Sequence, residues 1–443
     1  EDHEIISILR FGMTLSCFCA AAISWRPCCA QFIGPNAESG IDPLSERSRA
    51  GTSRGSFVTG RTNTRLRRFV GRHKSENTRR FELITCSTAE VAPPAASGTM
   101  QYKSLGGSDL LVSEICLGTM TFGRQITLEE SLDILNYGFD NGINFLDSAE
   151  VYPVPVSDEL WGKTEELIGQ WLKYRKREDV IIATKIASRP RRKLDKKNIQ
   201  IAVEGSLKRL GTDYIDLYQI HWPDRYVPLF GPTDFDIQQA EKTIDYVPIA
   251  EQVEAFAEQI DKGNIRYLGL SNETPWGLTT WQNTIRMMGL EKKCRIISVQ
   301  NAYSLINRVF DGHLAETCYQ EKIGLLGYSP LGFGVLTGKY LDGQKPDGAR
   351  MTIFKDFGQR YCRDPRVTQA VSLYSSIADK YELTPAQLAL AFCRSRWFID
   401  STIVGATTVE QLQEDLVAVN LELPPECLAE IDAVHKRLPN PAP

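Results

Sequence analysis

The stretch Val180-Ile181-Ile182-Ala183-Thr184-Lys185 is a short apolar run that stops at a charged residue. Two other stretches have the same design: Ile143-Asn144-Phe145-Leu146-Asp147 and Ile215-Asp216-Leu217-Tyr218-Gln219-Ile220-His221. Strands of a parallel sheet are buried on both faces and read as nearly continuous apolar runs. Each of these runs therefore predicts a buried parallel strand with a titratable residue at its carboxyl end. In a (β/α)8 barrel that end is where active sites lie.

Further strands and helices alternate from about residue 100 to the C-terminus. We predict strands at Ile115–Leu117, Asn144–Asp147, Val180–Thr184, Ile215–Ile220, Arg266–Leu270, Ile296–Val299, Leu325–Tyr328 and Ser401–Val404. We predict helices at Leu128–Asn141, Thr164–Lys173, Lys197–Leu210, Ile249–Lys262, Leu314–Lys322 and Val409–Val417. Glycines at the helix ends suit a left-handed cap: Gly142, Gly211, Gly263 and Gly324. Strands that alternate with helices indicate βαβ units, so the prediction is an α/β fold of the (β/α)8 TIM-barrel type.

An open doubly wound sheet is the alternative architecture. It would place a Gly-x-Gly-x-x-Gly turn after the first strand, whereas this chain has Gly118-Thr119-Met120-Thr121-Phe122-Gly123 there. The spacing favours the barrel. Around Gly106-Gly107 the flanking segments predict an N-terminal β-hairpin that closes the barrel bottom.

Two long loops follow predicted strands and are therefore expected above the catalytic end of the barrel. Long loops in compact domains are usually functional or disordered, so we assign a role to each. One runs from Trp222 to Val247 after the fourth strand and is interpreted as a wall of the substrate pocket. The other runs from Gly332 to about Arg363 after the seventh strand and is interpreted as a cofactor clamp. Aromatic residues expected around the substrate are Trp222, Tyr226 and Phe230, with Trp161 and Phe122 as possible additions.

The first 98 residues differ in composition from the rest of the 443-residue chain. Between Arg47 and Arg80 eleven residues are basic and one, Glu76, is acidic, interspersed with Ser, Thr and Gly. An Arg-rich, Ser-rich and acid-poor segment is typical of an organelle transit peptide. We therefore predict a targeting or disordered leader at 1–98, a barrel domain at 99–443, and a plastid location with the mitochondrion as the alternative. A nucleic-acid-binding arm is disfavoured, since no aromatic platform accompanies the basic residues.

Composition also excludes several classes of protein. With 42% hydrophobic and 24% charged residues the chain is ordinary for a soluble globular protein, and it contains no apolar run of about 18 residues, so no membrane span is expected. The six cysteines beyond the leader are scattered, without a C-x-x-C pair or Cys/His cluster: Cys116, Cys294, Cys318, Cys362, Cys393 and Cys427. We interpret them as buried free thiols and predict no metal site.

The residues Asp147, Tyr152, Lys185 and His221, in their strand contexts, resemble the catalytic tetrad of the aldo-keto reductase superfamily. The segments 329–340 (SPLGFGVLTGKY) and 403–412 (IVGATTVEQL) resemble that family's two cofactor segments. The likeness covers about residue 100 to the C-terminus and is strongest toward the Tas-like branch. It implies that Tyr152 gives the proton, Lys185 lowers the phenol pKa, Asp147 keeps Lys185 charged, and His221 orients the substrate oxygen.

The resemblance also implies an NADPH site. Tyr328 would stack on the nicotinamide, and Ser271, Asn272 and Gln300 would bond its carboxamide. The loop with Ser329, Pro330, Leu331, Gly332 and Lys339 would meet the pyrophosphate, as would Gly405 before a helix N-terminus. Thr407 and Arg350 would meet the 2′-phosphate, which selects NADPH over NADH. Gln411, Glu414 and Asp415 correspond to the adenosine contacts, with Asp415 in place of the usual Asn; an ionised carboxylate only accepts hydrogen bonds.

The expected function is reduction of an aldehyde or ketone to an alcohol by an NADP-dependent aldo-keto reductase. The expected partner is a small carbonyl compound, without nucleic acid or membrane. The alternative is a nucleotide-sensing regulatory subunit on the same barrel, like the potassium-channel β subunits, which the chain resembles around Ser329–Tyr340. That family has an amide where this chain has His221, so the intact tetrad favours the enzyme.

Overall fold

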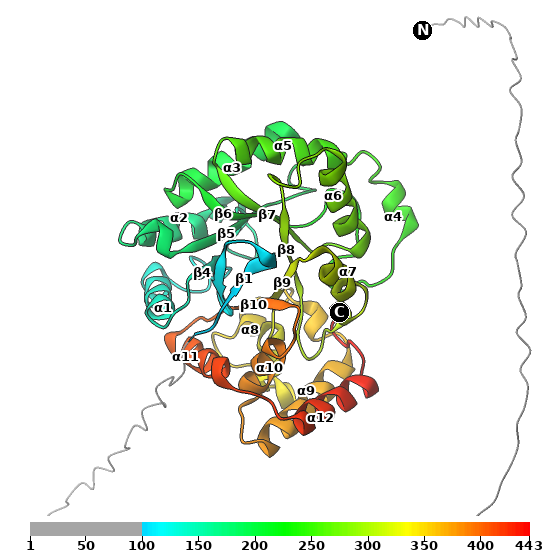
Figure 1. The fold of residues 1–443 in the computed structure, drawn as a ribbon. Helices are drawn as coiled ribbons and strands as arrows, with labels where there is room; N and C mark the ends of the chain where they lie inside the picture. Colours follow the sequence, from blue (N-terminus) through cyan, green and yellow to red (C-terminus); the bar gives the residue numbers. More distant parts are fainter. Residues whose placement is uncertain (1–99) are drawn as a thin grey trace, which may run out of the picture. The chain divides into compact units, whose positions relative to one another are not determined.

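Eight parallel strands close into a barrel in the computed structural model, which describes residues 100–443. The order around the barrel is β10-β3-β4-β5-β6-β7-β8-β9, and helices surround it (Figure 1). The strands are β3 Ile115–Gly118, β4 Phe145–Asp147, β5 Ile181–Ile186, β6 Ile215–Ile220, β7 Ile265–Ser271, β8 Ile296–Ala302, β9 Gly324–Tyr328 and β10 Ile399–Val404. The predicted TIM barrel is confirmed. The leader predicted at 1–98 lies outside the described residues.

The helices predicted from the sequence are present with bounds that agree within one residue. They are α1 Leu128–Asp140, α2 Lys163–Leu172, α3 Lys196–Leu210, α5 Ile249–Asp261, α7 His313–Glu321 and α11 Val409–Val417. Six further helices were not predicted: α4 Ile237–Glu241, α6 Pro275–Met287, α8 Arg350–Ile353, α9 Pro365–Lys380, α10 Pro385–Arg394 and α12 Pro425–Arg437. Helices α6 and α10 had readable starts, because Thr274 and Thr384 cap them and proline follows at the first helical position.

Three of the four predicted glycine caps adopt the left-handed conformation, and the fourth does not. Gly142, Gly211 and Gly263 have φ of 91°, 65° and 74°. At the end of α7 the left-handed residue is Lys322, with φ of 54°, and Gly324 is the first residue of β9. A Cβ on Gly324 would lie 1.8 Å from Asp400 Oδ2, so this glycine is needed for close strand packing and not for a cap.

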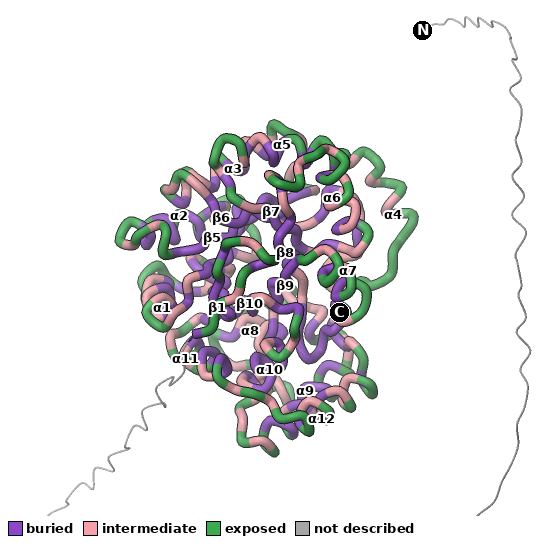
Figure 2. The backbone as a smooth tube through the Cα atoms, in the orientation of Figure 1, coloured by how far each residue is buried: buried purple, intermediate pink, exposed green. Residues whose placement is uncertain are grey.

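The strands of the barrel consist mostly of buried residues. All six residues of β5 and of β6 are buried, as expected for strands covered on the outside by helices and filled on the inside by side chains. The buried strands form the centre of Figure 2, and exposed residues lie on the outer faces of the helices. An outer core between strands and helices includes Ile182, Val203 and Phe256.

The predicted N-terminal hairpin closes the bottom of the barrel. Strands β1 Tyr102–Ser104 and β2 Leu111–Ser113 pair antiparallel. Their turn places Leu105 and Leu110 in one cluster with Phe145 and Leu217 of the barrel interior. Gly106 has φ of 52°, and a Cβ there would lie 2.0 Å from the carbonyl oxygen of Ile297, so only glycine allows the hairpin to approach this closely.

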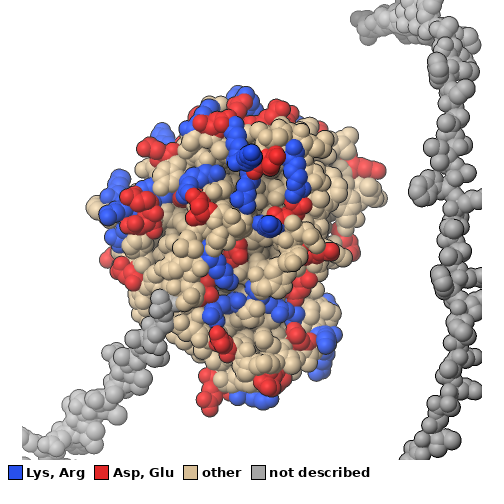
Figure 3. All heavy atoms as spheres, viewed as in Figure 1, with Lys and Arg blue, Asp and Glu red and all other residues tan. Residues whose placement is uncertain are grey.

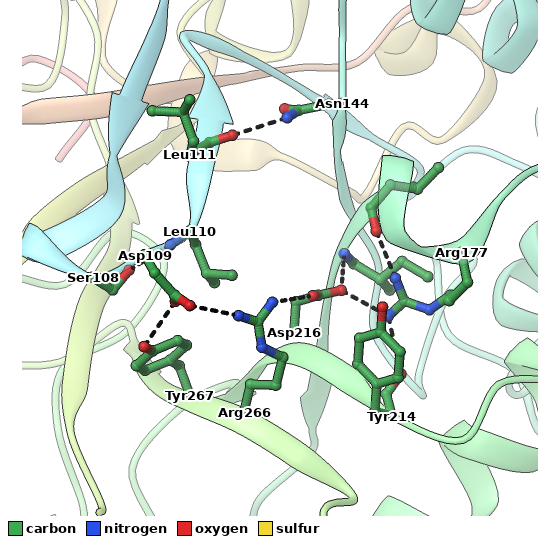
Figure 4. Close-up of polar contacts among 12 residues, drawn as sticks. Ser108, Asp109, Leu110, Leu111, Asn144, Arg177, Tyr214, Asp216, Arg266 and Tyr267 are labelled. Carbon is green, nitrogen blue, oxygen red and sulfur yellow. Dashed lines mark hydrogen bonds and ion pairs between the residues drawn. The ribbon is translucent and has the colours of Figure 1, made fainter. Parts of the chain in front are cut away.

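A network of charges ties this hairpin to the strands (Figure 4). Asp216 of β6 is buried and accepts hydrogen bonds from Arg177 at 2.7 Å and from Arg266 at 3.1 Å. Arg266 also donates to Asp109 of the hairpin turn at 2.9 Å, and Tyr267 donates to the same carboxylate at 2.8 Å. The charged groups of this end therefore compensate one another, and their role is structural.

Both predicted insertions are long segments at the opposite end of the barrel. The segment between β6 and α5 contains the short helix α4, and the segment between β9 and α9 contains α8. Lys and Arg intermingle with Asp and Glu over the face in Figure 3, without a continuous basic area on that face. Among residues 100–443, none of the helices has the length and apolar character that a membrane crossing requires.

Candidate active site

One cavity of about 1500 Å³ opens at the carboxyl ends of the strands. It exceeds the roughly 300–1,000 Å³ of common ligand pockets and leaves room for a large ligand beside a small one. Asp147, Tyr152 and His221 line it, whereas Lys185 is fully buried beside them. All predicted cofactor-binding residues line it except Gly332: Ser271, Asn272, Gln300, Tyr328, Ser329, Pro330, Leu331, Lys339, Arg350, Gly405, Thr407, Gln411, Glu414 and Asp415.

The ammonium of Lys185 connects the predicted carboxylate and phenol. Strand β5 extends to Ile186, so Lys185 is a strand residue and not the residue that follows the strand. Its Nζ donates to Asp147 Oδ2 at 2.6 Å, to the carbonyl of Ser148 at 2.7 Å and to the Tyr152 hydroxyl at 3.4 Å. Burial favours the neutral amine, but Asp147 and Tyr152 outweigh burial and raise the pKa of Lys185 above its ordinary value. Lys185 is therefore charged at neutral pH.

Two buried amides hold the carboxylate of Asp147 from its other side. Asp147 Oδ1 accepts from Gln300 Nε2 at 2.7 Å and from Gln219 Nε2 at 3.2 Å. Gln300 Nε2 also lies 3.2 Å from Gln219 Oε1. The ion pair with Lys185 thus has its remaining lone pairs satisfied, which a buried pair needs in order to be stable. Gln219, buried within β6, was not predicted as a site residue.

The pKa of Tyr152 differs from the expectation. Burial raises the pKa of the phenol above its ordinary value, and this outweighs the lowering by the Lys185 ammonium. Lys185 does lower the pKa of the phenol, as expected, but the net shift is upward because burial removes water from Tyr152. A neutral phenol keeps its proton, which is the form that a general acid needs.

His221 lies beside Tyr152 and Trp222. The ring centroids of His221 and Tyr152 are 5.7 Å apart in an edge-to-face arrangement, and those of His221 and Trp222 are 4.7 Å apart. Burial, followed by the Lys185 charge, lowers the pKa of His221 well below its ordinary value. Its Nδ1 is buried without a hydrogen-bond partner among the described residues. The imidazole is thus neutral, and a neutral ring has one N–H that can donate to an oxygen in the cavity.

The residues predicted to hold a carboxamide already bond one another. Asn272 Nδ2 donates to the carbonyl of His221 at 2.9 Å, and Asn272 Oδ1 accepts from the Tyr328 hydroxyl at 2.7 Å. Ser271 Oγ donates to the carbonyl of Gln300 at 2.8 Å. Asn272 therefore fixes the ring of Tyr328 relative to the backbone of His221, which follows the end of β6.

Two cations of the β9–α9 segment line the cavity without a carboxylate partner. Neither Lys339 nor Arg350 forms an ion pair within residues 100–443. Arg350 instead lies over the ring of Phe333, 4.7 Å from its centroid. Burial lowers the pKa of both groups, and Arg350 lowers that of Lys339 further. Half-buried cations without an ion-pair partner in a large cavity fit a ligand that carries phosphate groups.

The N-terminus of α11 forms the far wall of the cavity. Gln411 Oε1 accepts from Thr407 N and from Thr407 Oγ1, both at 3.0 Å. Glu414 is exposed and accepts from Thr384 Oγ1 at 2.8 Å. Asp415 is buried; burial and the nearby Glu414, opposed by Lys339, raise its pKa to about 7. Near neutral pH much of Asp415 is therefore a neutral acid with one O–H donor and free acceptor sites, like the amide it replaces.

Two backbone positions shape the loop after β9. Ser329 and Phe333 have φ of 56° and 58°, in the left-handed region that side chains rarely adopt. Gly332 has φ of 54° and is packed against Ile306 and Val335, so its role in this loop is conformational. Strain of this kind persists where the surrounding structure fixes it and is common at ligand sites.

The aromatic residues expected around the substrate divide into two groups. Trp222 and Phe230 line the cavity. Tyr226, Trp161 and Phe122 do not: Tyr226 stacks edge-to-face on Phe235, and Phe122 is fully buried in the core. These three expectations are wrong, because the sequence places a residue on a loop without giving the direction of its ring. Two lining residues of the β9–α9 segment, Phe333 and Arg360, were not predicted individually, although that segment was interpreted as a cofactor clamp.

Neither a disulfide nor a metal-binding cluster occurs within residues 100–443. The six cysteines there are all free, and Cys362 is exposed, in contrast to the expectation that all are buried. No group of His, Cys, Asp and Glu residues in this part of the chain has the geometry to hold a metal ion.

The sequence of the described domain matches known proteins of one family. The sequence model of the aldo/keto reductase family covers residues 114–436. The protein tas of Escherichia coli is 44% identical over 354 residues, which is 78% of this chain and all of that protein. A probable voltage-gated potassium channel subunit beta of Arabidopsis thaliana is 34% identical over 359 residues, 77% of this chain and 98% of that protein. An uncharacterized oxidoreductase of Bacillus subtilis, YrpG, is 32% identical over 74% of this chain and 94% of that protein.

Proposed function

The chain belongs to the aldo/keto reductase family, an oxidoreductase family, and from this premise we propose that it reduces an aldehyde or ketone to an alcohol with NADPH. The observation that carries the proposal is the position of the Tyr152 hydroxyl, on the wall of the cavity and 3.4 Å from the buried Lys185 ammonium. A neutral phenol beside a fixed positive charge can give up a proton, because the resulting phenolate is stabilised where it forms.

The chain's own residues support the proton transfer in three ways. Tyr152 donates its O–H proton to the carbonyl oxygen as the carbon is reduced, and the phenolate is then held by Lys185. Asp147 keeps Lys185 protonated, so that the positive charge persists through the step. His221, neutral and beside Tyr152, donates a hydrogen bond that orients the same oxygen. The ring of Trp222, which packs against His221, lines the cavity beside this site.

NADPH, when bound, would supply the hydride. Lys339 and Arg350 would hold its phosphates, Tyr328 would provide a flat face for the nicotinamide, and Asp415 would meet the adenine. The charge of Lys339 and Arg350 supports this assignment, since both are half-buried beside the cavity and neither forms an ion pair with an acid in the described part of the chain. A requirement for the 2′-phosphate is the specific part of the proposal and rests on Arg350.

A regulatory subunit that senses nucleotide is the second candidate. It is motivated by the 34% identity to a relative named a probable potassium channel subunit beta. In such a subunit the same cavity would bind the nucleotide. An imidazole at position 221, next to the phenol, favours chemistry over sensing, because binding a nucleotide alone needs no proton donor.

The test is steady-state NADPH oxidation with a panel of aldehydes and ketones, for the wild-type chain and for Tyr152→Phe. The variant should lose a factor of about 10² or more in kcat, as removal of a general acid does. Its affinity for NADPH, measured by fluorescence, should stay the same. Tight NADPH binding without turnover of any carbonyl compound would favour the sensing subunit, and a variant that keeps its turnover would exclude Tyr152 as the donor.

We also propose, from composition alone, that residues 1–98 direct the protein to the plastid. A fluorescent protein fused behind these residues should enter that organelle. A fusion that enters mitochondria would support the alternative, and one that stays in the cytosol would contradict both.

A further inference from the structure

Arg360 is a cation in the cavity that the proposed cofactor and catalytic roles leave unexplained. It belongs to the short 3-10 turn Gln359–Tyr361 of the β9–α9 segment and lines the cavity. Its guanidinium lies among aromatic rings, at 4.8 Å from the centroid of Tyr361, 5.8 Å from Tyr328 and 6.0 Å from Phe230. It donates to the Tyr361 hydroxyl at 2.7 Å.

No carboxylate accompanies this charge within residues 100–443. Several other partly buried arginines of the barrel pair with an acid: Arg192 with Glu150 at 3.0 Å, Arg209 with Glu165 at 2.7 Å and Arg225 with Glu273 at 2.5 Å. Arg360 has only hydroxyl groups and ring faces around it. Ring faces offset a part of the cost of burying a guanidinium, but its fork of N–H donors matches a carboxylate far better. The guanidinium of Arg360 can therefore bind an anion that enters the cavity.

The position of Arg360 relates it to the chemical end of the cavity. The ring of Tyr328, over which it lies, is tied through Asn272 to the carbonyl of His221. Phe230 belongs to the β6–α5 segment, which begins with Trp222 packed against the His221 ring. Arg360 thus lies where the two insertions meet above Tyr328, beside the space in which a carbonyl compound must lie to reach Tyr152 and His221.

We infer that Arg360 determines substrate specificity by binding a carboxylate of the carbonyl substrate, so that the enzyme favours aldehydes or ketones that carry an acidic group. This inference rests on the proposed reductase function. The flanking rings of Phe230 and Tyr361 hold the guanidinium in place, and its remaining N–H donors can bind one anion. A rigid aromatic acid such as 4-carboxybenzaldehyde is a suitable probe, since it places a carboxylate at a fixed distance from the reacting carbon.

The experiment compares 4-carboxybenzaldehyde with the uncharged 4-methylbenzaldehyde for the wild-type chain, Arg360→Gln and Arg363→Gln. Arg363 is the matched control, because it is an exposed arginine that lines the same cavity. The wild type should have the higher kcat/KM for the carboxylated aldehyde. Arg360→Gln should reduce that preference by about tenfold or more through KM, as loss of a charge-assisted hydrogen bond predicts. Arg363→Gln should keep the preference, and both variants should bind NADPH as the wild type does.

Several outcomes would overturn the inference. If Arg360→Gln weakens NADPH or slows both aldehydes equally, Arg360 serves the cofactor or the fold. If Arg363→Gln has the same effect, the preference reflects the general charge of the cavity. Binding of 4-(hydroxymethyl)benzoate against 4-methylbenzyl alcohol, read from quenching of intrinsic fluorescence, separates this inference from the reductase proposal. Should no aldehyde be turned over, the reductase proposal fails, while selective binding of the benzoate that Arg360→Gln abolishes still supports the anion site.

Discussion

Asp415→Asn should stabilise this protein, and by an amount that depends on pH. The carboxyl of Asp415 is 4% exposed and forms no hydrogen bond with another described side chain. Its pKa is raised from 3.8 to about 7, chiefly by burial. Well below pH 3.8 the acid is protonated in both the folded and the unfolded chain and contributes nothing. As pH rises, the unfolded chain ionises first, so the folded state loses stability until the folded group also ionises near pH 7.

The magnitude follows from the shift in pKa. A difference of about three units corresponds to about 4 kcal/mol above pH 8, and to about 2 kcal/mol at pH 5.5, at roughly 1.4 kcal/mol for each unit. An asparagine has the same shape and no charge at any pH, so the variant should recover this free energy. Urea unfolding at pH 5.5 and pH 8.5 measures it, with the exposed Glu426→Gln as a control for removal of one negative charge.

The same substitution tests how adenine is bound. A protonated carboxyl can donate one hydrogen bond and accept another, as an amide does, but an ionised one only accepts. The wild-type chain should therefore bind NADPH more weakly at pH 8.5 than at pH 6, and Asp415→Asn should remove this dependence. The reasoning is refuted if the variant has the same stability as the wild type at pH 8.5, or if its gain is equal at the two pH values.

Three further predictions concern other parts of the chain. Arg350→Ala should weaken NADPH more than NADH, because a charge-assisted phosphate contact contributes about 1.5–3 kcal/mol; equal weakening in fluorescence titrations would mean that Arg350 does not meet the 2′-phosphate. Asp216→Ala should lower the free energy of unfolding by about 3–5 kcal/mol, since Arg177 and Arg266 lose their shared buried partner, and kcat should not change because this network lies at the opposite end of the barrel. A chain that starts at Thr99 should melt cooperatively and keep full reductase activity; loss of either would show that the leader is part of the folded domain.

The sequence predicted the strand-end residues well because burial dictates their pattern. A strand covered on both faces can contain Lys185 only if an acid meets it, and Asp147 ends the neighbouring strand in register with Ala183 of β5. Periodicity likewise located α1 and α11, whose buried faces recur at helical spacing. The position of polar residues at strand ends therefore located the group Asp147, Lys185 and His221, whereas the cofactor-binding residues along the cavity followed from the family resemblance.

The directions of side chains and the pKa values of buried groups could not be predicted from the sequence. Phe122 and Phe230 are both aromatic residues on segments that follow strands, but one is fully buried in the core and the other lines the cavity. The raised pKa of Tyr152 depends on desolvation by its surroundings, including the Trp222 region far from it in the chain. Local sequence contains neither quantity, since both are set by how distant segments pack.

Charge in the cavity is compensated where the chemistry is proposed and uncompensated where ligands are proposed to bind. Lys185 pairs with Asp147 at 2.6 Å, and Asp147 also accepts hydrogen bonds from two glutamine side chains. The charges beside Tyr152 are therefore fully paired within the protein. Arg350 and Arg360 have aromatic rings and no acid among the described residues. A site whose charges are already paired does not reorganise when the proton moves. A cation without an acidic partner, in contrast, is stabilised when an anion binds to it. Arg350 fits the cofactor phosphate and Arg360 a second anion, which is why the position of Arg360 is informative about the substrate.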